Sequence, residues 1–289
     1  MNLIQEAFNT YRVTCRNKPK SIAKYIIRGV IHYKPLKLLN DNFKMGERKQ
    51  VFRNQPEFAL KAMRPYLRAG LSRMQAAQAV VEHHQWLDKH LNATARQMIF
   101  QYGLTLHRFE VGEEFYELKF LFLDSYRREG ELTLALCDKT GNKRYVITFT
   151  VIEGNAYVGG VQGSVDEDNF SKRFTKTVHG IRPKAFVVEA LRIVLNYFNI
   201  NNLYAVKNSA HVYADTRYKK KLNFNYDQLW REQRGIEFND WYYHLPLISE
   251  RKDIELIKRP KRKMYRERYT WLDQLNHDLA EELAKISIY

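Results

Sequence analysis

The middle of the chain is patterned like a series of β-strands. Runs rich in apolar and β-branched residues cover residues 116–123, 132–137, 145–152 and 156–161. Short polar turns that contain glycine join the last three runs, at Gly141 and Gly154. Because consecutive strands with short connections pair with their neighbours, this segment predicts an antiparallel meander.

The apolar spacing then changes to the longer period that is typical of helices. Residues 183–198 predict a helix that is buried along one side, and Pro183 stands in its first turn, where no amide hydrogen is required. Residues 203–206 predict a fifth short strand, and 210–222 a second helix. We therefore expect residues 116–224 to form one α/β unit.

Short helices are predicted on either side of this unit. In the first hundred residues, Ser21 and Ser72 stand where each can cap a helix, and Gly103 can end a helix over 93–102. Near the C-terminus an apolar stripe recurs at helical spacing, formed by Trp271, Leu272, Leu275, Leu279, Leu283 and Ile286. We expect this stripe to pack on the body of the protein.

The predicted fold class is mixed α+β or α/β. It comprises a helical basic region over 1–105, a mixed-sheet α/β core over 106–250 with flanking helices, and a basic C-terminal helix over 251–289. The length of 289 residues and a hydrophobic content of 45% suffice for a sizeable core. This composition argues against a disordered or low-complexity chain.

The positive charge is unevenly distributed. The chain carries 48 Lys and Arg against 32 Asp and Glu, whereas residues 1–73 hold sixteen against four and residues 110–170 hold six against twelve. A further basic run over 258–268 holds seven against one. The excess favours an anionic partner, such as an anionic membrane surface, an acidic acyl-carrier protein or nucleic acid. We expect residues 1–73 and 251–268 to share one positive surface.

No metal site or disulfide scaffold is predicted. The two cysteines, Cys15 and Cys137, are far apart and lie in no metal-binding motif. His83, His84 and His90 fall on one predicted helix, where we expect surface residues rather than metal ligands. The chain shows neither the apolar region of a signal peptide nor a transmembrane segment, which predicts a cytoplasmic protein. One hypothesis places it at the cytoplasmic face of the inner membrane as a peripheral protein.

Three segments are candidates for binding or catalysis. The segment Thr177–Pro183 places Gly180 and Arg182 before a helix, which suits a phosphate, although an ordinary helix start has the same pattern. The paired glycines of Val158–Gly163 indicate a bulge or the close approach of a ligand. The segment that follows residue 206 carries His211 as a candidate base, and the alternative for such a residue is packing.

These motifs, in this order, resemble the VirK/YbjX family of Gram-negative bacteria. The resemblance rests on Val158–Gly163, Thr175–Lys184, Asn208–His211, Tyr226–Glu232, Leu245–Pro246 and the basic run Arg262–Tyr269. It implies a role in virulence, in remodelling of the bacterial envelope and in resistance to cationic antimicrobial peptides.

The order of elements is also similar to the core of GNAT acyltransferases. This resemblance implies that the loop before the long helix binds the pyrophosphate of acyl-coenzyme A, and an acyl-carrier protein is the alternative donor. It implies Tyr218 or Tyr213 as the acid, with His211 or His179 as the base. The residues expected to bind the donor are Gln162, Gly163, Gly180, Ile181, Arg182 and Asn208.

A non-enzymatic protein that docks on an anionic membrane or on nucleic acid is the alternative function. A pocket between the fourth and fifth predicted strands, open toward Pro183, would favour the enzyme. A filled crevice at that place would favour the binding protein.

Overall fold

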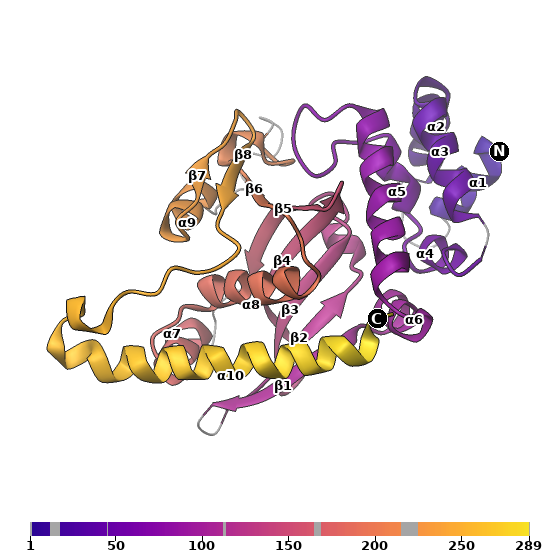
Figure 1. Cartoon of the computed structure of the whole chain (residues 1–289). Helices are drawn as coiled ribbons and strands as arrows, with labels where there is room; N and C mark the ends of the chain where they lie inside the picture. Colours follow the sequence, from indigo (N-terminus) through magenta and orange to yellow (C-terminus); the bar gives the residue numbers. More distant parts are fainter. Residues whose placement is uncertain are drawn as a thin grey trace.

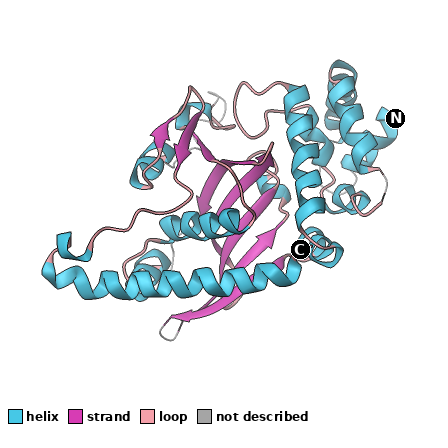
Figure 2. Cartoon of the chain, viewed as in Figure 1, coloured by secondary structure: helices cyan, strands magenta, loops and turns pink. Residues whose placement is uncertain are grey.

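The computed structural model describes residues 2–11, 18–44, 46–111, 114–164, 169–214 and 225–288. It confirms the mixed α+β class, with a twisted sheet that has helices packed on it (Figures 1 and 2). The N-terminal helices gather at one end of the sheet, and α8 (Pro183–Tyr197) and α10 (Arg262–Ile286) lie across one of its faces. None of the helices in these ranges is long and apolar enough to span a membrane.

The sheet has eight strands in the order β1-β2-β3-β4-β5-β6-β8-β7. Their bounds are β1 (Leu104–Val111), β2 (Glu114–Leu121), β3 (Leu132–Asp138), β4 (Lys143–Ile152), β5 (Asn155–Gly163), β6 (Leu203–Val206), β7 (Ile236–Glu237) and β8 (Tyr242–Leu245). The predicted meander is confirmed, because β2 to β5 pair antiparallel with their neighbours. The strands β1, β7 and β8 were not predicted, and β7 has only two residues, both exposed.

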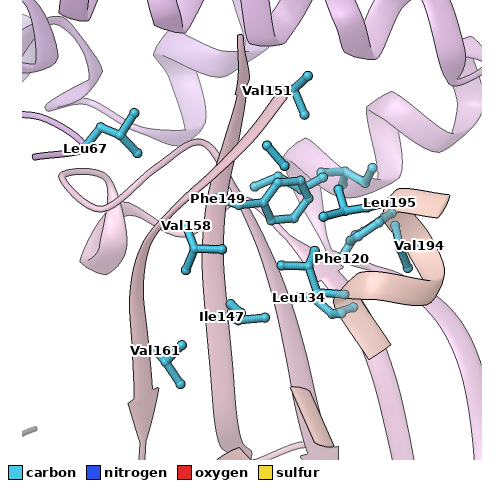
Figure 3. Close-up of a cluster of buried hydrophobic side chains, with 14 of the residues drawn as sticks. Leu67, Phe120, Leu134, Ile147, Phe149, Val151, Val158, Val161, Val194 and Leu195 are labelled. Atoms are coloured by element: carbon cyan, nitrogen blue, oxygen red, sulfur yellow. The ribbon is translucent and has the colours of Figure 1, made fainter. Parts of the chain in front are cut away.

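Strands β5 and β6 form the one parallel pair in this sheet. A parallel pair needs a long crossover, which α7 (Phe170–Thr177) and α8 supply. The predicted helix start at Pro183 is confirmed. Val194 and Leu195 of α8 pack among buried sheet residues such as Leu134 and Phe149, which anchors the crossover on the sheet (Figure 3).

The helical head consists of α1 (Leu3–Thr10), α2 (Lys18–Ile31), α3 (Tyr33–Phe43), α4 (Lys49–Asn54), η1 (Phe58–Ala62), α5 (Arg73–His90) and α6 (Ala93–Gln101). Ser72 caps α5 as predicted, in a reciprocal capping box with Gln75. The prediction that Ser21 caps a helix is wrong, because α2 already begins at Lys18. Pro19 is tolerated in that first turn, where its missing amide hydrogen is not needed.

His83 and His84 are buried, with 0% and 1% of their surface exposed, so the prediction that they lie on the surface is wrong. The helix α5 packs on α3 along one side and on β4 along another, which buries most of its circumference. The ring of His83 accepts a hydrogen bond from the amide of Val151 at 3.0 Å, and burial lowers the pKa of His83 to about 3. The third residue, His90, is half-buried and stacks on Trp86.

A buried ion pair joins the head to the sheet. Lys61 of η1 donates to Glu131, the residue before β3, at 2.7 Å, and both side chains are at most 1% exposed. The other oxygen of Glu131 lies 3.1 Å from Nε2 of His84. Burial alone would raise the pKa of Glu131, but Lys61 and His84 hold this pKa at about 2.

The C-terminal segment contains η5 (Ile254–Leu256), η6 (Arg259–Lys261) and α10. As predicted, the apolar stripe packs on the body, and Leu275, Leu279 and Leu283 are buried. The expectation of one shared positive surface is wrong, because residues 251–268 and the head lie at opposite ends of the molecule (Figure 1). The helix α10 runs along the sheet face, so its basic start is a helix length away from the head.

Replacing Glu131 with Gln should strongly destabilise the fold, because Lys61 then stays buried without a carboxylate. We expect Glu131→Gln to lower the free energy of unfolding by about 3–5 kcal/mol, as measured by urea unfolding at neutral pH. The double variant Lys61→Met/Glu131→Gln removes both charges and should lose clearly less. Equal losses in the single and double variants would contradict a buried, ionised pair.

Candidate anion-binding site

The sequence-predicted site residues fall into two groups in the structure. One group lies in the loop before α8, and the other lies near the ends of β5 and β6. Tyr218 lies outside the described residues, as does most of the predicted helix over 210–222.

The loop before α8 uses its backbone amides internally. The amide of Gly180 donates to the carbonyl of Thr175 at 2.8 Å, and that of Ile181 donates to the carbonyl of Val178 at 2.9 Å. A Cβ atom at Gly180 would lie 2.7 Å from the guanidinium of Arg268, so α10 covers this side of the loop. These two amides therefore do not project toward a ligand.

Carboxylates as well as a guanidinium lie near the charged residues of this loop. Arg182 is the N-cap residue of α8 with a side chain 66% exposed, as predicted, and it lies 4.0 Å from Glu232. The carbonyl of His179 accepts two hydrogen bonds from Arg268, and its ring lies 3.6 Å from Glu267. The carboxylates reduce the positive potential that the loop offers to an anion.

The paired glycines of β5 admit a side chain of the protein itself. The register of β4 and β5 shifts at this point, which makes Gly159 the extra residue of a bulge. A Cβ atom at Gly159 would lie 2.0 Å from the carbonyl oxygen of Glu129, and one at Gly160 would lie 2.1 Å from its carboxylate. The predicted close approach is therefore made by Glu129, while Gly163, at the end of β5, lies against the ring of Tyr145.

Glu129 is 1% exposed and lies between two residues that were predicted for the site. One carboxylate oxygen accepts a hydrogen bond from the amide of Gln162 at 2.6 Å and lies 4.0 Å from Nε2 of His211. The other oxygen accepts no hydrogen bond from any residue that the structure describes. Burial raises the pKa of Glu129 to about 8, which places its proton exchange near neutral pH.

His211 is a neutral ring whose two nitrogens differ in their contacts. Its Nδ1 accepts a hydrogen bond from the amide of Tyr213 at 3.3 Å, so the ring proton belongs on Nε2. Nε2 makes no well-formed hydrogen bond with the described residues, and a contact of the ring with the backbone of Gly159 acts to raise its pKa. Burial lowers the pKa of His211 to about 4, and the ring stacks on Tyr226 at 4.8 Å between centroids. At neutral pH, His211 therefore presents a hydrogen-bond donor at Nε2 rather than a base.

Asn208 positions the helix that carries Tyr226. It belongs to η3 (Asn208–Ala210), and its side-chain oxygen accepts the amide of Tyr226, the first residue of α9 (Tyr226–Glu232), at 2.8 Å. Its own amide donates to Asp227 at 2.9 Å. Asn208 thus connects the end of β6 to the start of α9.

Side chains of α9 fill the opening between β5 and β6. These strands pair only as far as Val158 and Ala205. Beyond that point the hydroxyl of Tyr226 donates to the carbonyl of Val161 at 3.1 Å, and Trp230 donates to the carbonyl of Val206 at 2.7 Å. The crevice is filled where these two side chains lie, which favours the binding protein by the criterion given above.

A cationic cavity of about 630 Å³ lies between the helical head and this polar cluster. Among the residues that the structure describes, its lining contains no acid and consists of Tyr11, Ser21, Lys24, Arg28, Arg64, Pro65, Ala69, Gly70, Leu71, Arg73, Arg128, His211 and Val212. Its four arginines are half-buried, and its lysine is exposed. We call this feature the cationic cavity.

Three of these cations have no carboxylate within 4 Å among the described residues: Lys24, Arg28 and Arg73. Burial, Arg128 and Arg28 all lower the pKa of Arg73, which shows that like charges face one another here. A bound anion would relieve this repulsion. The planar guanidinium fork matches the oxygens of a phosphate or carboxylate, and the cavity is large enough for a small ligand or a headgroup.

Neither the cavity nor Glu129 was predicted from the sequence. The cations come from α2, from residues 64–73 and from Arg128, so no local motif contains them. The only signal was the strong positive charge of the head. For Glu129, the available signal was the pair Gly159-Gly160, whose missing side chains make room for it.

The raised pKa of Glu129 predicts a pH-dependent stability. Folding shifts this pKa from 4.5 to about 8, so the stability it contributes is complete below pH 4.5 and is lost as the pH rises to 8. Between pH 4.5 and pH 8, the free energy of unfolding of the wild type should fall relative to that of Glu129→Gln, by at most about 1.4 kcal/mol per pH unit. Urea unfolding at several pH values measures the difference. The exposed Glu250→Gln is the control, and a pH-independent difference for Glu129→Gln would contradict the raised pKa.

Comparison with known proteins places the chain in a family. A family model described as "Protein of unknown function (DUF535)" matches residues 15–281. The Escherichia coli K12 protein named "Uncharacterized protein YbjX" is 31% identical over 238 residues, which are 78% of this chain and 72% of that protein. Two Haemophilus influenzae proteins, each named "Uncharacterized protein", are 31% identical over 156 and 159 residues, which are 53% and 54% of this chain and 53% of each relative.

No solved structure gives a significant match. The family model covers most of the chain, and the YbjX match extends over nearly four fifths of it. The chain therefore belongs to the DUF535 family and is homologous to YbjX of Escherichia coli, as its resemblance to the VirK/YbjX family predicted.

Proposed function

We propose that the protein binds a phosphate-bearing ligand in the cationic cavity. The observation that carries the proposal is the convergence of Lys24, Arg28 and Arg73 on one cavity. Within the described part of the chain, these three cations have no carboxylate partner and the cavity lining contains no acid. Bringing two half-buried arginines and an exposed lysine together without counter-charges costs free energy, and an anionic ligand offsets this cost when it binds.

The geometry favours a compact ligand over a nucleic acid. Four arginines surround a cavity rather than following an open groove along which a phosphate backbone could run. The family resemblance implies a role in remodelling of the bacterial envelope. A phosphate-bearing component of the envelope, such as a lipid headgroup or its precursor, is therefore the ligand class that we propose.

Acyl transfer is the second candidate function, and the pair Glu129–His211 favours it. Each side chain has a polar atom without a well-formed hydrogen bond to any described residue, and His211 forms part of the cavity wall. The ionised Glu129 would accept a proton from an attacking hydroxyl or amine, and Nε2–H of His211 would donate to the developing oxyanion. Collapse of this intermediate would break the acyl C–S bond, and the departing thiolate of the donor would take up the proton held by Glu129. The acyl donor would be acyl-coenzyme A or an acyl-carrier protein.

Ligand-induced stabilisation tests the binding function. We expect short-chain phosphatidic acid, and more weakly inorganic phosphate, to raise the thermal stability of the wild type, by about 2.7 kcal/mol at a hundredfold excess over Kd. The variant Arg28→Gln/Arg73→Gln should lose this response while its ligand-free form stays at least as stable. The control Arg231→Gln/Arg234→Gln removes two cations outside the cavity lining and should respond like the wild type. An unchanged response of the cavity variant would refute the proposal.

Product formation separates acyl transfer from binding alone. The wild type is incubated with labelled acetyl-coenzyme A and lysophosphatidic acid, whose free glycerol hydroxyl is the acceptor, and Glu129→Gln is the comparison. Transfer that rises with pH around an apparent pKa near 8 and falls at least about a hundredfold in Glu129→Gln would support the enzyme. Binding without transfer from acetyl-coenzyme A or from an acyl-carrier protein would leave the binding function alone.

A further inference from the structure

We propose that α1 and α2 form a membrane-docking surface, which inserts into an anionic bilayer beside the cationic cavity. The proposal deepens the function above, because it makes the bilayer the source of the phosphate-bearing ligand. It has its own evidence in the apolar side chains of these two helices.

Both helices expose large apolar side chains. Ile4 and Phe8 lie one turn apart on α1 and are 58% and 55% exposed. On α2, Ile27, Val30 and Ile31 are 60%, 64% and 67% exposed. The spacings of three and four residues put each set on one side of its helix, so the exposure is a continuous feature rather than scattered single residues.

An apolar groove of about 780 Å³ runs between the two helices. Phe8 lines it from α1, and Ile22, Ala23 and Ile26 line it from α2. The helices that carry the groove and these exposed side chains lie at the end of the molecule farthest from the start of α10 (Figure 1). We call the groove and these side chains the α1–α2 apolar face.

Cations border this face on the side of the cavity. Lys20, Lys24 and Arg28 are spaced by four residues along α2, so they form one ridge, and Lys24 and Arg28 line the cationic cavity. Ile27 and Ile31 lie on the neighbouring ridge. One helix thus carries a surface suited to acyl chains beside a surface suited to phosphates.

The positive charge around the α1–α2 apolar face favours an anionic bilayer as the partner that binds there. Residues 7–40 contain eight Lys and Arg and no Asp or Glu. A second copy of the chain would bring the same positive charge against this one, which disfavours a dimer through this face. A nucleic acid would use the cations but leave the apolar side chains in water. An anionic lipid surface satisfies both, since its headgroups attract the cations and its acyl chains receive the apolar side chains.

Docking in this way would set the cavity at the level of the headgroups. The side chains of Lys24 and Arg28 then lie between the bilayer and the interior of the cavity. A lipid phosphate could then move from a contact with the exposed lysine at the rim to a contact with the half-buried arginines inside the cavity, without passing through water. The basic segment 258–268 lies at the other end of the molecule and has no part in this contact (Figure 1).

Vesicle flotation tests the docking surface. The vesicles are phosphatidylcholine alone or phosphatidylcholine mixed with phosphatidylglycerol, and the variant is Phe8→Ser/Ile27→Ser. We expect the wild type to float with the mixed vesicles only, and the variant to bind them about tenfold or more weakly. The matched control Ile248→Ser/Leu256→Ser removes two side chains that are 77% and 85% exposed outside the α1–α2 apolar face and should bind like the wild type.

Insertion is measured independently by replacing Phe8 with Trp. Brominated lipids in the mixed vesicles should quench this tryptophan, and should not quench one placed at Leu256. Equal vesicle binding by Phe8→Ser/Ile27→Ser and the wild type, or a lack of quenching at position 8, would overturn the docking proposal. Because the serine variant keeps its cavity, its stabilisation by soluble short-chain phosphatidic acid reports on the proposed function separately.

Discussion

The ion pair between Lys61 and Glu131 is the contact on which the arrangement of the two halves depends. It joins η1 of the head to the start of β3 where both side chains are at most 1% exposed, and Nε2 of His84 lies 3.1 Å from the second carboxylate oxygen. A buried charge tolerates little displacement, because moving either partner leaves the other without compensation. The pair therefore sets the position of the head on the sheet, and the cationic cavity forms between these two parts.

The residues just before Glu131 extend this junction to the candidate site. The carbonyl of Arg128 accepts the amide of Leu67 at 2.7 Å, and its guanidinium donates to the carbonyls of Pro65 and Val212. Glu129 follows and fills the space left by the paired glycines of β5. Residues 128–131 therefore include three residues of different roles. Arg128 lines the cavity, Glu129 lies behind the cavity wall, and Glu131 pairs with Lys61 of the head. The geometry of the site is thus coupled to the packing of the fold.

The spacing of apolar residues predicted the helices and strands that have one clear repeat. It did not predict which residues are buried between elements, or which residues distant in the sequence come into contact. The helix from Pro183 and the strands β2 to β6 follow from spacing alone. His83 and His84 were misplaced because a helix that is buried on two sides does not show the one-sided stripe of a surface helix. Gln162 and His211 were predicted separately, but Glu129, which lies between them, was missed because only the fold brings these three residues together.

The net charge of the head does not distinguish cations that lie near carboxylates from cations that do not, and this difference is the more informative feature. Arg48, Arg64 and Arg96 all lie within 4 Å of carboxylates, so their charge is largely balanced where it stands. Lys24 and Arg28 have no such partner among the described residues, and both line the cavity. If the positive charge served only solubility, unpaired cations would be expected to spread apart over the surface to lower their mutual repulsion. Their convergence beside the α1–α2 apolar face instead supports the proposal that an external surface, both anionic and apolar, supplies the counter-charge that the described residues do not provide.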